Sequence, residues 1–220
     1  MKADIVFLHT SPVHIETFEQ LVRQEDPATT TRHVVVEQLL ADVQTASTDD
    51  TALVARIHRA MIDAVGDGAS VVVCTCSTIG GAAERVPTGA RFRAMRVDRP
   101  MADRAVRSGP RILLVAALES TLAPTSRLLH ESAVAFGRDI DVHPLLVDEA
   151  WPHFERGDRE AYVRTVADAV RAAAGAADVV VLAQASMASA SELLTDLGLP
   201  VLSSPRLGVR AAIDATRRRG

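Results

Sequence analysis

A near-repeat inside the chain constrains its fold more than any other feature. Residues 69–84 and 177–192 align without a gap, and the same residues recur at matching places: Ala69, Val71, Val72, Val73, Ala82 and Glu84. The constant offset, 184 − 76 = 108 residues, places Gln184 opposite Cys76. We therefore predict two similar half-domains. If they face each other, one contributes a thiol and the other an amide to a shared cleft.

The composition is that of a globular chain. Of its 220 residues, 48% are hydrophobic and 24% are charged, which is enough apolar material for one large domain or two small ones. The net charge of −4 and the 3% of aromatic residues argue against a nucleic-acid partner. The apolar run Ile5–Leu8 near the start of the chain is too short for the hydrophobic region of a signal peptide. No apolar run reaches the roughly 18 residues of a membrane span. We expect a cytoplasmic protein without a membrane partner.

The two cysteines, Cys74 and Cys76, are separated by a single residue. This spacing is too short for an unstrained disulfide between them, and two thiols are too few for a structural zinc site. We therefore expect free thiols in a reducing compartment and no metal ion.

The pattern of apolar runs predicts an α/β fold with parallel sheets. Runs such as Val71–Val73 and Ile112–Val115 do not alternate with polar residues, as expected for strands covered by helices on both faces. Strands are predicted at 4–9, 32–36, 70–75 and 92–97, and again at 111–116, 141–146, 178–183 and 201–203. Helices are predicted at 15–23, 52–65, 124–136, 159–174, 189–196 and 207–218, and a further helix is predicted to begin directly after Cys76. Each half is then a flavodoxin-like or Rossmann-like unit.

Small polar residues gather where these strands end. In such folds ligands bind beyond the carboxyl ends of the strands, and residues at helix N-termini offer N–H groups to an anion. A small carboxylate is the predicted ligand, with the following binding residues: Thr10, Ser11, Ser77, Thr78, Ser120, Thr121, Ala185 and Ser186.

At these residues the chain resembles the aspartate/glutamate/hydantoin racemase superfamily over nearly its whole length. Ile5–Pro12 is similar to the family's first strand and substrate loop, and Cys76-Ser77-Thr78 matches its Cys-Asn-Thr motif with Ser77 in place of Asn. Leu182–Met187 stands where hydantoin-type members have Leu-Gly-Cys-Ala-Gly-Met. The resemblance implies halves related by a pseudo-twofold, one comprising residues 1–97 with 206–220 and the other residues 98–205. Its members tend to form homodimers.

The resemblance also implies a reaction without a cofactor, in which two cysteines remove and return a proton beside a carboxylate. Here Gln184 replaces the second cysteine, and an amide is neither an acid nor a base near neutral pH. Malonate-type decarboxylases and maleate isomerases resemble this scaffold and use one thiol. We therefore predict an isomerase or lyase for a small carboxylic acid, with Cys76 as thiolate and Gln184 orienting the substrate.

Two alternatives remain open at this point. The chain could be a non-catalytic carboxylate-binding protein on a racemase-like scaffold. It could instead be an amino-acid or hydantoin racemase in which His9, or another group, replaces the second thiol. Cys74 is expected to be a buried, unreactive cysteine.

Overall fold

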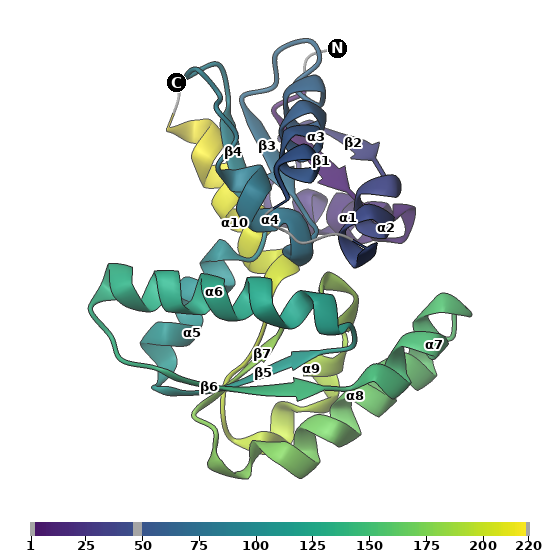
Figure 1. The fold of residues 1–220 in the computed structure, drawn as a ribbon, viewed down its shortest axis with the longest axis vertical. Helices are drawn as coiled ribbons and strands as arrows, with labels where there is room; N and C mark the ends of the chain where they lie inside the picture. The colour runs from purple at the N-terminus through teal and green to yellow at the C-terminus, as the bar shows by residue number, and fades with distance from the viewer. Residues whose placement is uncertain (1–2, 46–49, 219–220) are drawn as a thin grey trace. The chain divides into compact units, whose positions relative to one another are not determined.

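The computed structural model describes residues 3–45 and 50–218, so the first two residues of the chain lie outside it. The chain divides into two compact units, Met1–Asp98 with Pro205–Gly220 and Arg99–Ser204. Each unit contains one four-stranded parallel sheet with helices packed around it (Figure 1). The predicted α/β fold class is confirmed.

The sheet of the first unit has the strand order β2-β1-β3-β4. Its strands are β1 (Ile5–His9), β2 (Thr31–Val35), β3 (Val71–Cys74) and β4 (Arg93–Arg96). Its helices are η1 (Pro12–His14), α1 (Ile15–Glu25), α2 (Gln38–Thr45), α3 (Thr51–Asp63), α4 (Ser77–Glu84) and α10 (Ser204–Arg217). Every residue of β1 and β3 is buried, which explains why neither strand alternates in sequence.

The sheet of the second unit repeats this topology with the order β6-β5-β7-β8. Its strands are β5 (Arg111–Ala116), β6 (Asp141–Leu146), β7 (Val179–Leu182) and β8 (Val201–Ser203). Its longer helices are α5 (Arg99–Ser108), α6 (Glu119–Phe136) and α8 (Arg159–Ala173). Shorter turns are η2 (Asp148–Ala150), α7 (Trp151–Glu155), η3 (Ala174–Ala176), η4 (Ala185–Met187), α9 (Ala190–Leu193) and η5 (Thr195–Leu197).

The registers of the two sheets correspond. Leu8 pairs with Cys74 in the first sheet, and Val115 pairs with Leu182 in the second. Because all strands are parallel, the carboxyl ends of β1 and β3 lie at one edge, as do those of β5 and β7. The loops that carry the predicted site residues therefore gather at one edge of each sheet.

The structure corrects two predicted helices. Helix α6 begins at Glu119 rather than at 124, so Pro124 lies inside the helix instead of starting it. Proline removes one helical hydrogen bond but leaves the earlier turn intact, and Glu119 suits the positive end of the helix dipole. The predicted helix at 189–196 is broken into α9 and η5. Helices α2, α5 and α7 were not predicted.

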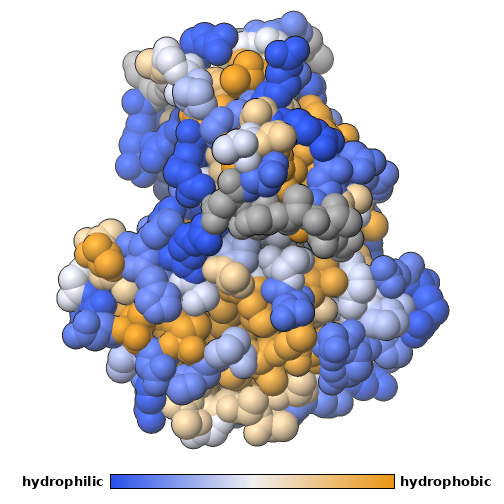
Figure 2. Space-filling model, viewed as in Figure 1, coloured by the Kyte–Doolittle hydropathy of each residue, from blue (hydrophilic) through white to orange (hydrophobic). Residues whose placement is uncertain are grey.

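Exposed hydrophobic side chains occur mainly on the second unit. Val134, Phe136 and Leu146 are exposed on α6 and β6, and Figure 2 shows a broad hydrophobic area in this region of the surface. Among the described residues, no helix is long and apolar enough to cross a membrane.

Candidate functional site

Cys76 lies at the N-terminus of α4, directly beyond the end of β3. It is the N-cap residue, with extended backbone angles of φ −96° and ψ 117°, and its side chain is partly exposed. The first N–H groups of a helix have no partner within the helix and favour a negative charge. The strand and the helix therefore place this thiol beside the positive end of the helix dipole.

Cys74 lies in a different environment two residues earlier. Its side chain is fully buried in the core with Leu39, Ile57 and Met61, and its Sγ donates to the Cys76 carbonyl oxygen at 3.6 Å. Burial raises the pKa of the Cys74 thiol well above its usual value. Cys74 is thus a buried thiol, as expected, and only Cys76 is accessible.

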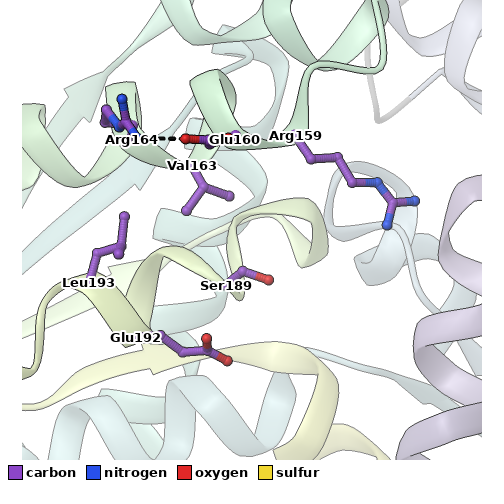
Figure 3. A pocket seen from close by; sticks show the side chains of 7 residues that line it. All are labelled: Arg159, Glu160, Val163, Arg164, Ser189, Glu192 and Leu193. Carbon is purple, nitrogen blue, oxygen red and sulfur yellow. Dashed lines mark hydrogen bonds and ion pairs between the residues drawn. The ribbon is translucent and has the colours of Figure 1, made fainter.

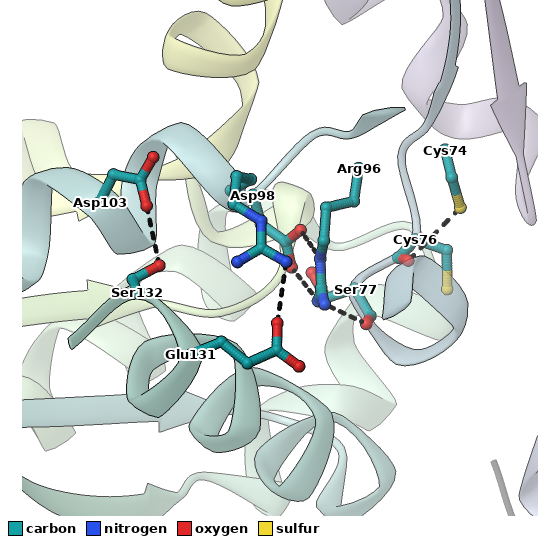
Figure 4. A network of polar contacts seen from close by, with 9 residues as sticks. Cys74, Cys76, Ser77, Arg96, Asp98, Asp103, Glu131 and Ser132 are labelled. Carbon is teal, nitrogen blue, oxygen red and sulfur yellow. Dashed lines mark hydrogen bonds and ion pairs between the residues drawn. The ribbon is translucent and has the colours of Figure 1, made fainter. Parts of the chain in front are cut away.

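A buried ion pair supports the helix turn that carries Cys76 (Figure 4). Arg96 binds Asp98 in a bidentate manner, with N···O distances of 2.6 and 2.9 Å, and both side chains are almost fully buried. Arg96 Nη2 also donates to the Ser77 carbonyl oxygen at 3.3 Å. Sequence reasoning missed Arg96. The available signal was an arginine at the end of a predicted strand with a carboxylate two residues later.

The predicted hydroxyl residues of the first unit lie at the same edge of its sheet. Thr10 and Ser11 follow β1, and Ser77 and Thr78 form the first turn of α4 beyond the neighbouring strand β3. Thr10, Ser77 and Thr78 are buried, whereas Ser11 is partly exposed and makes no side-chain cap hydrogen bond. The structure therefore gathers these four residues and Cys76 around adjacent strand ends.

Both ring nitrogens of His9 have partners within the first unit. Nδ1 lies 2.9 Å from Thr75 Oγ1, and Nε2 lies 2.8 Å from His33 Nδ1. Burial, followed by the charges of His33 and His14, lowers the pKa of His9 to about 3. His9 is therefore neutral near pH 7 and, in this arrangement, presents no free nitrogen to a substrate.

Gln184 follows β7 and is fixed to the end of the neighbouring strand β5. Its Oε1 accepts a hydrogen bond from the backbone N–H of Ala117 at 2.6 Å. Two residues later, the Ser186 hydroxyl lies 2.8 Å from the hydroxyl of Tyr162 on α8. Tyr162 is buried, and burial raises its pKa to about 12. Side-chain hydrogen bonds thus hold this loop at two points.

The other predicted residues of the second unit lie near the same sheet edge. Ser120 and Thr121 belong to the first turn of α6, rather than to a loop before it as predicted, because α6 begins at Glu119. Thr121 is buried, and the buried Ser120 Oγ has no hydrogen-bond partner among the described residues. Ala185 is partly exposed in η4.

The second unit also contains a surface hollow of about 400 Å³ between α8 and α9 (Figure 3). It is lined by charged and apolar residues, none of which is a predicted site residue: Arg159, Glu160, Val163, Arg164, Ser189, Glu192 and Leu193. Within the described parts of the chain, no group of three or more His, Cys, Asp or Glu residues is arranged to hold a metal ion.

Known structures share this fold. An aspartate racemase from Picrophilus torridus has a TM-score of 0.70 at 13% identity, covering 97% of this chain and 94% of its own. A glutamate racemase from Bacillus anthracis has a TM-score of 0.70 at 14% identity, covering 100% and 84%. An allantoin racemase from Pseudomonas fluorescens has a TM-score of 0.58 at 19% identity, covering 98% and 91%. At these identities the likeness concerns the fold.

A match to the sequence model of a protein family identifies the relationship more closely. No curated protein matches the chain in sequence. The family model, however, matches residues 8–212, which include the whole second sheet, the first sheet from the end of β1 onward, and both strand ends carrying Cys76 and Gln184. The chain belongs to the Asp/Glu/hydantoin racemase family.

Proposed function

We propose that this protein is a cofactor-independent isomerase or lyase that acts on a small carboxylic acid through a single thiolate, Cys76. Membership of the racemase family supports an enzyme of this general type. The position of Cys76 at the N-terminus of α4 and its partly exposed side chain support its role, because a helix N-terminus favours a negative charge. The gathered hydroxyl groups of the first unit suit a carboxylate ligand.

The observation that carries the one-thiol proposal is the side chain at position 184. Racemisation removes a proton from one face of a carbon and supplies one at the other face, so it needs two groups that exchange protons. Gln184 cannot do this, and its oxygen is bound to the Ala117 N–H. His9 is neutral, with both ring nitrogens occupied. A single thiol suffices for decarboxylation, or for isomerisation by thiol addition.

The test is a panel of amino acids, hydantoins, substituted malonates and maleate, assayed with purified protein in heavy water. We expect turnover of a malonate-type or maleate-type acid and weak or no racemisation of amino acids. Cys76→Ser should abolish turnover, and Cys74→Ala should retain it. Efficient racemisation of aspartate, glutamate or a hydantoin that persists in Cys76→Ser would overturn the proposal.

A second candidate function is the binding of a small carboxylate without catalysis. It is favoured by the hydrogen bonds that occupy Gln184 and His9, because they leave Cys76 without an obvious partner for proton exchange. A binding protein would retain the hydroxyl-rich strand ends without needing a reactive thiol. Carboxylate binding unchanged in Cys76→Ser, with no turnover of any acid in the panel by the wild type, would favour this candidate.

A further inference from the structure

The orientation of the Gln184 amide is fixed by its contact with Ala117. A backbone N–H can only donate, so the side-chain atom 2.6 Å from Ala117 N must be the carbonyl oxygen. Assignment of oxygen and nitrogen, which is often ambiguous for glutamine, is therefore determined here by the partner. Ala117 is 1% exposed, so its N–H has little access to solvent.

Rotating the Gln184 amide by about 180° would cost free energy. It would direct the NH2 group at the Ala117 N–H and leave that buried donor unpaired. The loop itself is also restrained, because Met187 N donates to Gln184 O at 3.0 Å and Ser186 contacts the buried Tyr162. The amide therefore keeps its oxygen on the Ala117 N–H at the end of β5, and its nitrogen is directed away from that N–H.

The Gln184 oxygen already accepts one hydrogen bond, whereas the NH2 group is the uncommitted donor of the side chain. Among the described residues no hydrogen bond to Gln184 Nε2 is present, and the side chain is partly exposed. An NH2 group offers two donors and no acceptor. It can bind an oxygen anion but not an ammonium group.

We propose that Gln184 is a specificity-determining residue that selects an oxygen anion, carboxylate or enolate, at its position and disfavours an ammonium group there. This inference rests on the proposed function, because it assumes that the ligand is a small carboxylic acid. It assigns polarity to that ligand: the group beside Gln184 carries negative charge. A dicarboxylate is therefore preferred over an amino acid of similar size.

Two small acids that differ in one charged group test this polarity. Malonate and glycine share a carboxylate and a methylene, but malonate has a second carboxylate where glycine has an ammonium group. Isothermal titration calorimetry with the full chain should show that malonate binds more tightly than glycine. A charge-assisted hydrogen bond accounts for a difference of about tenfold or more.

The decisive variant is Gln184→Glu. It retains an oxygen to accept from the Ala117 N–H and replaces the NH2 donor by a second oxygen. We expect the preference for malonate over glycine to fall by about tenfold or more near pH 7, with little change in thermal stability. Relative to wild type, malonate binding should recover as the pH falls and the new carboxyl group is protonated, because it then donates a hydrogen bond.

Two further variants separate specificity from structure. Gln184→Met has similar length but no hydrogen-bonding group, so it should lose both malonate preference and stability. Gln20→Glu makes the same charge change on the exposed face of α1, where the Gln20 side chain bonds to Glu16 and to no other described residue, and should leave binding unchanged. An unchanged preference in Gln184→Glu, or a wild type that binds glycine as tightly as malonate, would overturn the inference. The predicted binding pattern without turnover would instead leave it intact and contradict the proposed enzymatic function.

Discussion

Cys76 and Gln184 follow equivalent strands in closely similar backbone geometry. Their φ and ψ angles are −96° and 117° for Cys76 and −110° and 139° for Gln184. The residue before Cys76 donates its N–H to Leu8 O at 3.0 Å, and the residue before Gln184 donates to Val115 O at 2.9 Å. Each side chain therefore starts from a closely similar backbone conformation at the end of its own sheet. The difference between the two positions lies in the side chain and its partners.

This equivalence makes Gln184→Cys an informative variant. The new thiol would occupy the backbone setting that Cys76 has in the first unit, so we expect faster exchange of the substrate's α-proton with heavy water, measured by NMR. Loss of the bond to Ala117 N should lower the free energy of unfolding by about 1–3 kcal/mol, measured by urea denaturation. Exchange no faster than in wild type, in a variant that remains folded, would contradict this expectation.

The two cysteines should differ sharply in reactivity. Cys76 is partly exposed at a helix N-terminus, whereas Cys74 is fully buried and has a raised pKa. Brief treatment with iodoacetamide near neutral pH should alkylate Cys76 and leave Cys74 unmodified, as measured by peptide mass spectrometry. The variants Cys74→Ala and Cys76→Ser serve as a matched pair, and the signal should disappear only in the second. Equal labelling of both residues would remove the basis for the proposed site.

The buried strands could be predicted from the sequence because a strand covered on both faces consists of an uninterrupted run of apolar residues. Val71–Val73 and Ile112–Val115 are apolar without alternation, and the repeat placed Cys76 and Gln184 at corresponding strand ends. The start of α6 was not predictable in this way. Proline is common in the first turn of helices, so Pro124 favours a helix start at its own position. The helix begins five residues earlier, at Glu119.

The contacts within the candidate site were harder to predict than its location. His33 and His143 occupy matching places on the second strand of each sheet, yet His33 contacts His9 while the exposed His143 pairs with Asp141. Sequence periodicity locates a side chain on a strand but does not identify its partner from another strand. For the same reason, the bond from Ala117 to the Gln184 side chain had no sequence signal.

The buried His9 should make stability depend on pH. Its folded pKa of about 3 lies below the unfolded value near 6.5, so between these values the unfolded chain binds more protons. Stability is therefore fully present above about pH 6.5 and is lost as the pH falls toward 3. The pKa of its partner His33 is also lowered by burial, so His33 likewise contributes to the loss of stability as the pH falls.

Urea denaturation between pH 5 and pH 8 measures this effect above the range in which most carboxylates titrate. Well below pH 6.5 the contribution of His9 to the slope should approach about 1.4 kcal/mol per pH unit. His9→Gln should remove one histidine's share of the slope, while the two curves run parallel above pH 7. The same slope in both proteins at pH 5–6 would show that His9 is not the group responsible.

Gly80 and Gly81 should respond differently to alanine, because only Gly80 packs tightly against Arg96. A Cβ on Gly80 would lie 3.0 Å from Arg96 Nε and 3.2 Å from its Cζ, whereas a Cβ on Gly81 meets only ordinary contacts at 3.4 Å or more. Arg96 cannot move aside easily, since it is buried and bound to Asp98 through two hydrogen bonds. Gly81→Ala should raise the free energy of unfolding by about 0.5–1 kcal/mol, the usual gain for glycine to alanine within a helix.

Gly80→Ala should instead lower the free energy of unfolding by about 1–3 kcal/mol through overpacking, measured by urea denaturation against Gly81→Ala as the matched control. Because Arg96 also holds the Ser77 carbonyl, displacement of its guanidinium should disturb the first turn of α4. The rate of Cys76 alkylation should therefore change in Gly80→Ala and remain near wild type in Gly81→Ala. Equal stability and equal alkylation rates in the two variants would show that Arg96 does not support the turn that carries the thiol.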